Sequence, residues 1–304
     1  MFVLLWSTGF VGAKYGLPDA DPFAFLAIRL AIASTVLGLA ALATRTRLTG
    51  EQAGRAAVSG LLLHATYLGG VFFAISRGTP AGVSSVIVSL QPVLVAVLAW
   101  RLLGETLSGR QWSGLVVGVL GVALVLAPTL GGAVPTVGLL SCLVALAGGT
   151  VGTLWQKRHG DGIPLLAGTF MQYAVAAGVL GILSLVTERP RVQWTPRFAA
   201  ALAYLVVALS IGAVLLLLAL LRRGSAASVS TLLYLVPPAT AVESFLLFDE
   251  RLSAVSVVGI GVAALGVALV VAPSRRGVVA PAGGQEAVPD RVFNLADRPA
   301  EADL

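Results

Sequence analysis

The sequence predicts an all-α integral membrane protein with ten transmembrane helices, arranged as two inverted five-helix repeats. The first observation is composition: 57% of the 304 residues are hydrophobic and 11% are charged, whereas soluble domains carry about 25% charged residues. The second is the length of the uncharged runs, such as residues 111–156, which exceed the roughly 20 residues needed to cross a bilayer. The third is that the second half of the chain repeats the pattern of the first.

The duplication is clearest in two apolar segments, 83–100 and 229–248, each interrupted by proline near its middle. Pro92 and Pro238 lie 146 residues apart, and the Arg-Gly pairs that precede the two segments have the same separation. We therefore expect three regions: repeat 1 (1–128), repeat 2 (134–273) and a tail of mixed charge without apolar periodicity, predicted to be disordered in the cytoplasm (274–304).

Ten spans follow from the apolar runs and the short polar links between them. The first, which includes Met1 to Trp6, begins abruptly and lacks the basic start and cleavage site of a signal peptide. This is compatible with a true start a few residues upstream. The predicted spans are 1–17, 23–44, 56–76, 80–100, 110–127, 134–156, 163–186, 198–221, 225–248 and 254–272.

The distribution of Lys and Arg predicts the orientation. With the N-terminus inside, eleven of these residues near span ends are cytoplasmic and five are not, so both termini are predicted in the cytoplasm, with the protein in the bacterial inner (plasma) membrane. The Arg-rich link 188–197 runs against this bias. Because each half has five spans, the halves enter the membrane with opposite orientation, as in many secondary transporters.

Interrupted helices at matching positions of two repeats indicate a transporter's binding site, although proline in membrane helices also serves packing alone. His64 is the most deeply placed ionisable residue and is a candidate for proton coupling or substrate binding, with a structural hydrogen bond as the alternative. Lys14, Arg29 and Glu243 form a predicted intramembrane charge cluster, in which pairing between them is the simplest role. Close glycine spacing at Gly148 and Gly152 predicts tight helix packing.

Other classes of function lack their signatures. The chain has no nucleotide-binding loop, no Gly-x-Ser-x-Gly, no zinc-protease motif and one cysteine, Cys142, so we expect no enzyme, no metal site and no cofactor. The net charge of +6 comes from arginines that flank apolar runs. Such arginines set membrane orientation, so the charge does not indicate a nucleic-acid partner. The expected partners are a small-molecule substrate and the lipid bilayer, and a homodimer is left open.

With its halves laid out, the chain resembles EamA-type transporters of the drug/metabolite transporter (DMT) superfamily. The resemblance covers about residues 1–273, and no single motif carries it. The matching stretches are Leu5–Lys14, Leu26–Leu30, Ala81–Ser85, Leu90–Pro92, Leu103–Glu105, Gln111–Trp112, Tyr234–Pro238 and Asp249–Glu250. Glu243 departs from the neutral residue expected at its position.

The resemblance implies ten helices, alternating access, and export of small metabolites or drugs. The predicted cavity lies between the halves, lined by spans one, three, four, six, eight and nine. A channel or a lipid-translocating protein of the same topology is the alternative, although the sequence shows no carbonyl filter motif. Candidate cavity residues are Trp6, Thr8, His64, Tyr67, Gln91, Pro92, Thr150, Tyr234 and Pro238.

Overall fold

The computed structural model describes residues 2–103, 108–128, 135–189, 191–213, 216, 236–248 and 253–271. These residues are helical apart from short links and one isolated β-bridge between Ala20 and Val192. The predicted tail, 274–304, lies outside the described residues. An all-helical fold is therefore confirmed for the described part of the chain.

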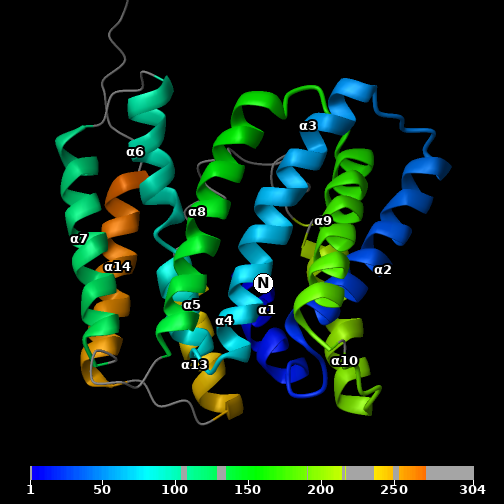
Figure 1. The fold of residues 1–304 in the computed structure, drawn as a ribbon. Coiled ribbons are helices and arrows are strands. Elements are labelled where there is room, and N and C mark those ends of the chain that lie inside the picture. The colour runs from blue at the N-terminus through cyan, green and yellow to red at the C-terminus, as the bar shows by residue number, and fades with distance from the viewer. Residues whose placement is uncertain are drawn as a thin grey trace, which may run out of the picture. The chain divides into compact units, whose positions relative to one another are not determined.

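The helices follow the predicted order along the chain (Figure 1). Those of the first half are α1 (Phe2–Gly16), α2 (Pro22–Ala43), α3 (Gly50–Gly60), η1 (Leu61–Leu68), α4 (Gly69–Ser76), α5 (Ala81–Val88), α6 (Gln91–Leu103) and α7 (Gly109–Leu126). Those of the second half are α8 (Thr136–His159), α9 (Leu165–Thr187), α10 (Pro196–Tyr204), η3 (Leu205–Ala213), α13 (Val236–Phe248) and α14 (Ala254–Val271).

Five continuous helices are long and apolar enough to cross a membrane, among the residues that the structure describes. Shorter apolar helices occupy three more of the predicted spans. The chain is thus a multi-pass membrane protein, and the count of ten spans stays a prediction. The five long helices are Pro22–Ala43, Gly50–Ser76, Thr136–His159, Leu165–Thr187 and Pro196–Ala213.

The third span begins earlier than predicted, at Gly50, because a capping box starts its helix. The Thr49 side chain accepts a hydrogen bond from the backbone N–H of Gln52, and the Gln52 side chain accepts one from the backbone N–H of Thr49. These reciprocal bonds satisfy two of the N–H groups that every helix start leaves unpaired. The sequence carried this signature, but the hydropathy pattern placed the boundary six residues later.

The predicted interruption of the fourth span is confirmed. α5 ends at Val88, Ser89 and Leu90 form a turn, and α6 begins at Gln91. Pro92 is the second residue of α6, where its missing N–H leaves no helix hydrogen bond unmade. In the ninth span, residues 225–235 lie outside the described part, and α13 contains Pro237 and Pro238 in its first turn.

Two spans change from α-helix to π-helix partway along. η1 continues directly from α3, and η3 continues directly from α10. π-helical turns are rare and concentrate at functional sites. In η1 the Thr66 hydroxyl donates to the carbonyl of Leu61, five residues earlier, which matches the wider helical turn.

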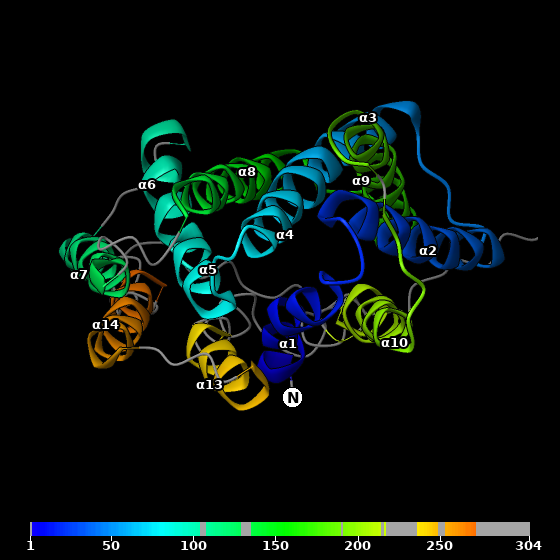
Figure 2. The same cartoon turned by 60° about the horizontal axis from the view of Figure 1, so that its bottom comes forward.

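Close helix pairs build the fold, and both views show α7 beside α14 and α2 beside α9 (Figures 1 and 2). The predicted glycine packing on α8 is also confirmed. A Cβ at Gly148 would meet Thr66, and one at Gly152 would meet Leu63. The missing side chains therefore allow α8 to lie directly against η1.

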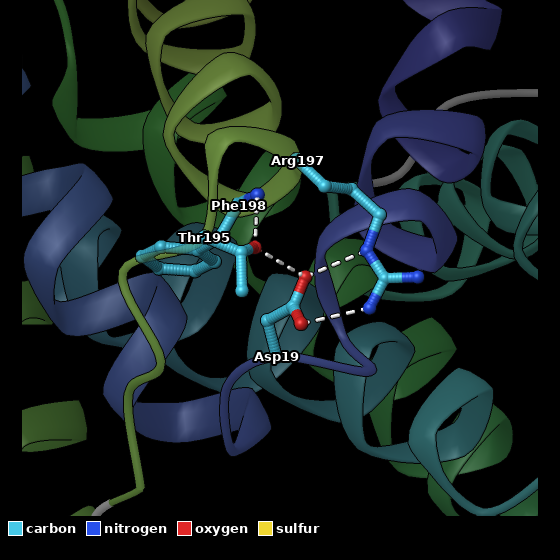
Figure 3. A network of polar contacts seen from close by, with 4 residues as sticks. All are labelled: Asp19, Thr195, Arg197 and Phe198. Carbon is cyan, nitrogen blue, oxygen red and sulfur yellow. Dashed lines mark hydrogen bonds and ion pairs between the residues drawn. The ribbon is translucent and has the colours of Figure 1, made fainter.

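Polar contacts join the link before α2 to the start of α10 (Figure 3). Both carboxylate oxygens of Asp19 accept hydrogen bonds from Arg197, at 2.7 Å each, and Oδ2 also accepts one from the Thr195 hydroxyl at 3.0 Å. Thr195 is the N-cap of α10, and its hydroxyl accepts a hydrogen bond from the backbone N–H of Phe198. One carboxylate thus fixes the positions of two links that are distant in the sequence.

Candidate functional site

A cluster of polar side chains lies between the two halves of the chain, where α2, η1, α9 and η3 meet. The Nε atom of Arg29 donates to the Ser210 hydroxyl at 3.2 Å. His64 Nε2 and Gln172 Oε1 are 3.2 Å apart. Tyr173 lies between the two pairs: its hydroxyl donates to the Ser210 carbonyl at 3.4 Å, and its ring makes an edge contact with His64.

Arg29 is the most consequential member of this polar cluster. Its side chain is buried, and among the described residues no carboxylate forms an ion pair with it. A guanidinium has five N–H donors, and Ser210 accepts from one of them. A charged group buried in a membrane protein without such a partner is a candidate for a functional site.

A second polar group gathers at the interruption between α5 and α6. Gln91 Nε2 donates to the Thr153 hydroxyl on α8 at 2.8 Å. Gly149 makes room for this contact, because a Cβ there would lie 2.6 Å from Gln91 Oε1 and 2.9 Å from the Tyr67 ring. The structure therefore brings the predicted residues Tyr67 and Gln91 together against α8, where Thr153 contacts Gln91.

Three other predicted cavity residues lie in different surroundings. Thr150 is buried, and its hydroxyl donates within its own helix to the Leu146 carbonyl at 2.6 Å. Thr8 hydrogen-bonds the hydroxyl of Tyr204 at 2.6 Å, and Trp6 packs against the hydrophobic core.

Pro92, Pro238 and Tyr234 are the remaining predicted cavity residues. The structure describes the backbone of Pro92 and Pro238 as helical, but not their side chains, and Tyr234 lies outside the described residues. Their role in lining a cavity stays a prediction.

The predicted charge cluster divides into separate contacts. Glu243 Oε1 accepts a hydrogen bond from the buried Ser7 hydroxyl at 2.8 Å, so Glu243 joins α13 to α1. The Lys14 ammonium lies 4.5 Å from the centre of the Phe248 ring, in a cation–π contact. Arg29 contacts Ser210 instead, and no ion pair joins Arg29 to Glu243. The expected pairing of Arg29 with Glu243 is therefore absent.

A separate cavity of about 890 Å³ opens beside α4, α8 and the end of α9, and it contains none of the predicted site residues. Arg77, Arg189 and Arg191 lie along it, together with Phe23 and Phe73. The sequence signal was the Arg-rich link 188–197, which opposes the charge bias of the other links. Sequence reasoning noted that anomaly without assigning it a site. Among the described residues, no group of three metal-ligating side chains occurs here or elsewhere.

The EamA-like transporter family matches this chain twice, over residues 1–127 and 136–272. An uncharacterized transporter of Bacillus subtilis, YvbV, is 28% identical over 252 residues, which cover 83% of each chain. The uncharacterized transporter sll0355 of Synechocystis is 28% identical, covering 84% of this chain and 83% of its own. WAT1-related protein At3g02690, chloroplastic, of Arabidopsis thaliana is 29% identical over 87% of this chain and 66% of its own.

A solved crystal structure shares the fold, with a TM-score of 0.63 and 20% sequence identity over 88% of this chain and 93% of the other. At that identity the likeness concerns the fold alone. The family matches cover nearly all of the described helices, and the relatives carry the names of transporters rather than enzymes. The chain therefore belongs to the EamA-like transporter family of the DMT superfamily.

Proposed function

We propose that this protein is a secondary transporter that exports a small metabolite or drug across the plasma membrane by alternating access. Two inverted five-helix repeats, residues 1–128 and 134–273, would move against each other around the polar cluster, with both termini in the cytoplasm. The observation that carries the proposal is that the contacts of this cluster are reciprocal between the two halves.

The residues of the cluster occupy matching positions in the two halves. Arg29 is the eighth residue of α2, and Gln172 is the eighth residue of α9. His64 follows the threonine N-cap of α3 by fifteen residues, and Ser210 follows the threonine N-cap of α10 by fifteen residues. His64 and Ser210 are also 146 residues apart, the spacing of the two prolines.

The contacts exchange between these matching positions. Arg29 of the first half bonds Ser210 of the second, and Gln172 of the second bonds His64 of the first. In each bond, the eighth residue of α2 or of α9 contacts the residue that lies fifteen positions after a threonine N-cap in the opposite half. Such exchange is what a two-fold relation between the halves produces, since each contact is made twice.

The same exchange recurs in α7 and α14. A Cβ on Gly121 would meet Ala263, and a Cβ on Gly266 would meet Gly118. Gly118 and Ala263 are 145 residues apart, as are Gly121 and Gly266. Reciprocal contacts at two separate places, the polar cluster and the α7–α14 pair, support a relation between the halves rather than one local coincidence.

The π-helices supply the element that could change between two arrangements. η1 and η3 carry His64 and Ser210, and each adjoins an α-helical stretch of the same span. Because the wider turn is less favourable than the α-helix, a ligand in the cluster can select one local winding over the other. The charge on Arg29 favours a substrate with a carboxylate or another anionic group.

The proposal is tested by comparing metabolites in the medium of cells that overproduce the wild type or Arg29→Gln. We expect anionic metabolites to accumulate outside only with the wild type, and the identified compound to show saturable countertransport in proteoliposomes. Arg29→Gln should lower that flux by about a hundredfold, because it removes a charged hydrogen bond to the substrate that contributes about 3 kcal/mol.

Arg45→Gln, at an exposed turn, is the matched control and should transport normally. His64→Ala adds a test of proton coupling, since a coupling role requires loss of flux driven by a pH gradient while exchange of substrate continues. Equal flux in wild type and Arg29→Gln would contradict the role given to the cluster. A conductance that does not saturate would favour a channel and overturn the carrier.

A further inference from the structure

The cavity beside α4, α8 and α9 has a charged mouth and an apolar interior. Arg77 follows the end of α4, while Arg189 and Arg191 follow the end of α9, so the three guanidinium groups lie where these helices end. Gly69, deeper in the cavity, precedes Arg77 by eight residues, which corresponds to about 12 Å along the helix. The cavity therefore extends from the level of the helix ends into the hydrocarbon region of the membrane.

The three arginines have no charged partner among the described residues. Arg197, from the same region of the chain, pairs with Asp19, but no ion pair involves Arg77, Arg189 or Arg191. The guanidinium of Arg77 lies over the Phe73 ring, 4.6 Å from its centre. Such a contact leaves the N–H groups at the edge of the guanidinium free to donate to an anion.

Two carboxylates also lie along the cavity, but backbone N–H groups already engage them. Glu188 accepts hydrogen bonds from the backbone of Phe23 and Ala24, at 3.0 and 3.2 Å. Asp21 accepts one from the backbone of Arg191 at 2.9 Å. These bonds fix the first turn of α2 and the link after α9, and the three arginines outnumber the two carboxylates, so the lining keeps a net positive charge.

The wall of the cavity beyond the arginines suits an acyl chain. Phe73 lies one helical turn before Arg77 and stacks on Phe23 with ring centres 5.6 Å apart, and Gly69, Val144 and Leu183 also line the cavity, the last two with exposed side chains. A volume of about 890 Å³ is within the range of sites that hold a substantial organic ligand. Exposed aliphatic side chains beside such a cavity indicate that it opens toward the lipid rather than toward water.

We propose that this cavity is a binding site for an anionic phospholipid. Its phosphate contacts Arg77, Arg189 and Arg191, and one acyl chain passes Phe73 toward Gly69 and Val144. The site accounts for arginines that the charge bias of the chain does not explain, because their role is to hold a headgroup rather than to set orientation. It is independent of the transport proposed above, and binding is measured without a transport substrate.

Native mass spectrometry of the full chain in detergent, titrated with dioleoylphosphatidylglycerol or dioleoylphosphatidylcholine, tests the proposal. We expect retained adducts with phosphatidylglycerol and few with phosphatidylcholine. The variant with Arg77→Gln, Arg189→Gln and Arg191→Gln should bind phosphatidylglycerol about a hundredfold more weakly, since each arginine near an anionic lipid contributes about fivefold. The control is Arg45→Gln with Arg47→Gln and Arg158→Gln, which lie in links or helix ends outside the cavity and should bind normally.

Val144→Trp separates a lipid from a free phosphate. Val144 is exposed on α8, so a larger side chain there occupies the cavity without disturbing the core, and Val151→Trp on the same helix is the control. We expect Val144→Trp alone to weaken phosphatidylglycerol binding. Equal binding of the two lipids, or full binding by the triple arginine variant, would overturn the proposal. Displacement of the lipid by millimolar inorganic phosphate, with no effect of Val144→Trp, would assign the arginines to a small anion instead.

Discussion

Two helix pairs, α7–α14 and α2–α9, both join the first half of the chain to the second, but they do so by different chemistry. The α7–α14 contact is made by Gly118, Gly121, Ala263 and Gly266, where backbone meets backbone. The α2–α9 pair carries Arg29 and Gln172, whose bonds reach η3 and η1.

The difference suggests a division of roles. The α7–α14 pair has one close arrangement, because the backbone contact at its glycines, and the packing of Val122 and Val125 against Ile260, lose their dispersion energy as soon as the helices separate. Beside the α2–α9 pair, the polar cluster is held by hydrogen bonds between side chains, from Arg29 to Ser210 and between His64 and Gln172, which can exchange partners at little cost. A transporter needs both: a fixed contact that keeps the halves together and a second contact that can be rearranged.

The largest effect is expected from Gly121→Ala, at the α7–α14 contact. The new methyl group would overlap the backbone of Ala263, which cannot move without displacing the whole of α14. We expect a loss of about 3 kcal/mol in the free energy of unfolding, at the upper end of ordinary overpacking. Gly261→Ala, on the same partner helix with no atom within 4 Å of the new Cβ, is the control for thermal unfolding in detergent. Equal stability of the two variants would show that Gly121 is not in close contact with the backbone of Ala263.

A pH-dependent effect of intermediate size is expected at Asp19, which joins the link before α2 to the start of α10. The hydrogen bonds from Arg197 hold the pKa of Asp19 below its usual value of 3.8. A carboxylate with a lowered pKa stabilises the folded state at neutral pH, and that contribution is lost as the pH falls through the lowered pKa.

Asp19→Asn should therefore melt several degrees below the wild type at neutral pH, and the two should converge as the pH falls below 3.8 and through the lowered pKa of Asp19. Gly121→Ala, whose contact contains no titratable group, should show a constant deficit over the same range. Thermal unfolding of all three proteins as a function of pH measures both trends. A deficit of Asp19→Asn that does not change with pH would exclude the ion pair as its cause.

The smallest effect is expected from Gly38→Ala, on the α2–α9 side. The new methyl group would lie 2.9 Å from the Cδ2 atom of the Phe170 ring, a side chain that is only partly buried. Because a ring can rotate away where a backbone cannot, we expect a change within about 1 kcal/mol, partly offset by the higher helix propensity of alanine. A loss as large as that of Gly121→Ala would mean that the two helix pairs are equally rigid, and would remove the contrast between them.

The sequence by itself determined the class of the protein, because apolar runs of membrane-spanning length and short charged links can be read without knowing any contact. It also located the interruption at Gln91 and the glycine face of α8, since proline chemistry and small-residue spacing are local properties of the chain. It named His64 and Arg29 as unusual, because a charged or titratable residue at membrane depth is conspicuous in any alignment of spans.

Only the tertiary structure decided what these residues contact. Arg29 bonds Ser210 rather than Glu243, and His64 meets Gln172, because helix rotation about its axis selects one partner among several at the same depth. Ser210 was not predicted as a site residue, because a single serine in an apolar run does not indicate a binding site. The arginine-lined cavity could not be read from the sequence for the same reason. Its lining comes from α2, η1, α4, α8, α9 and three links, which are far apart along the chain.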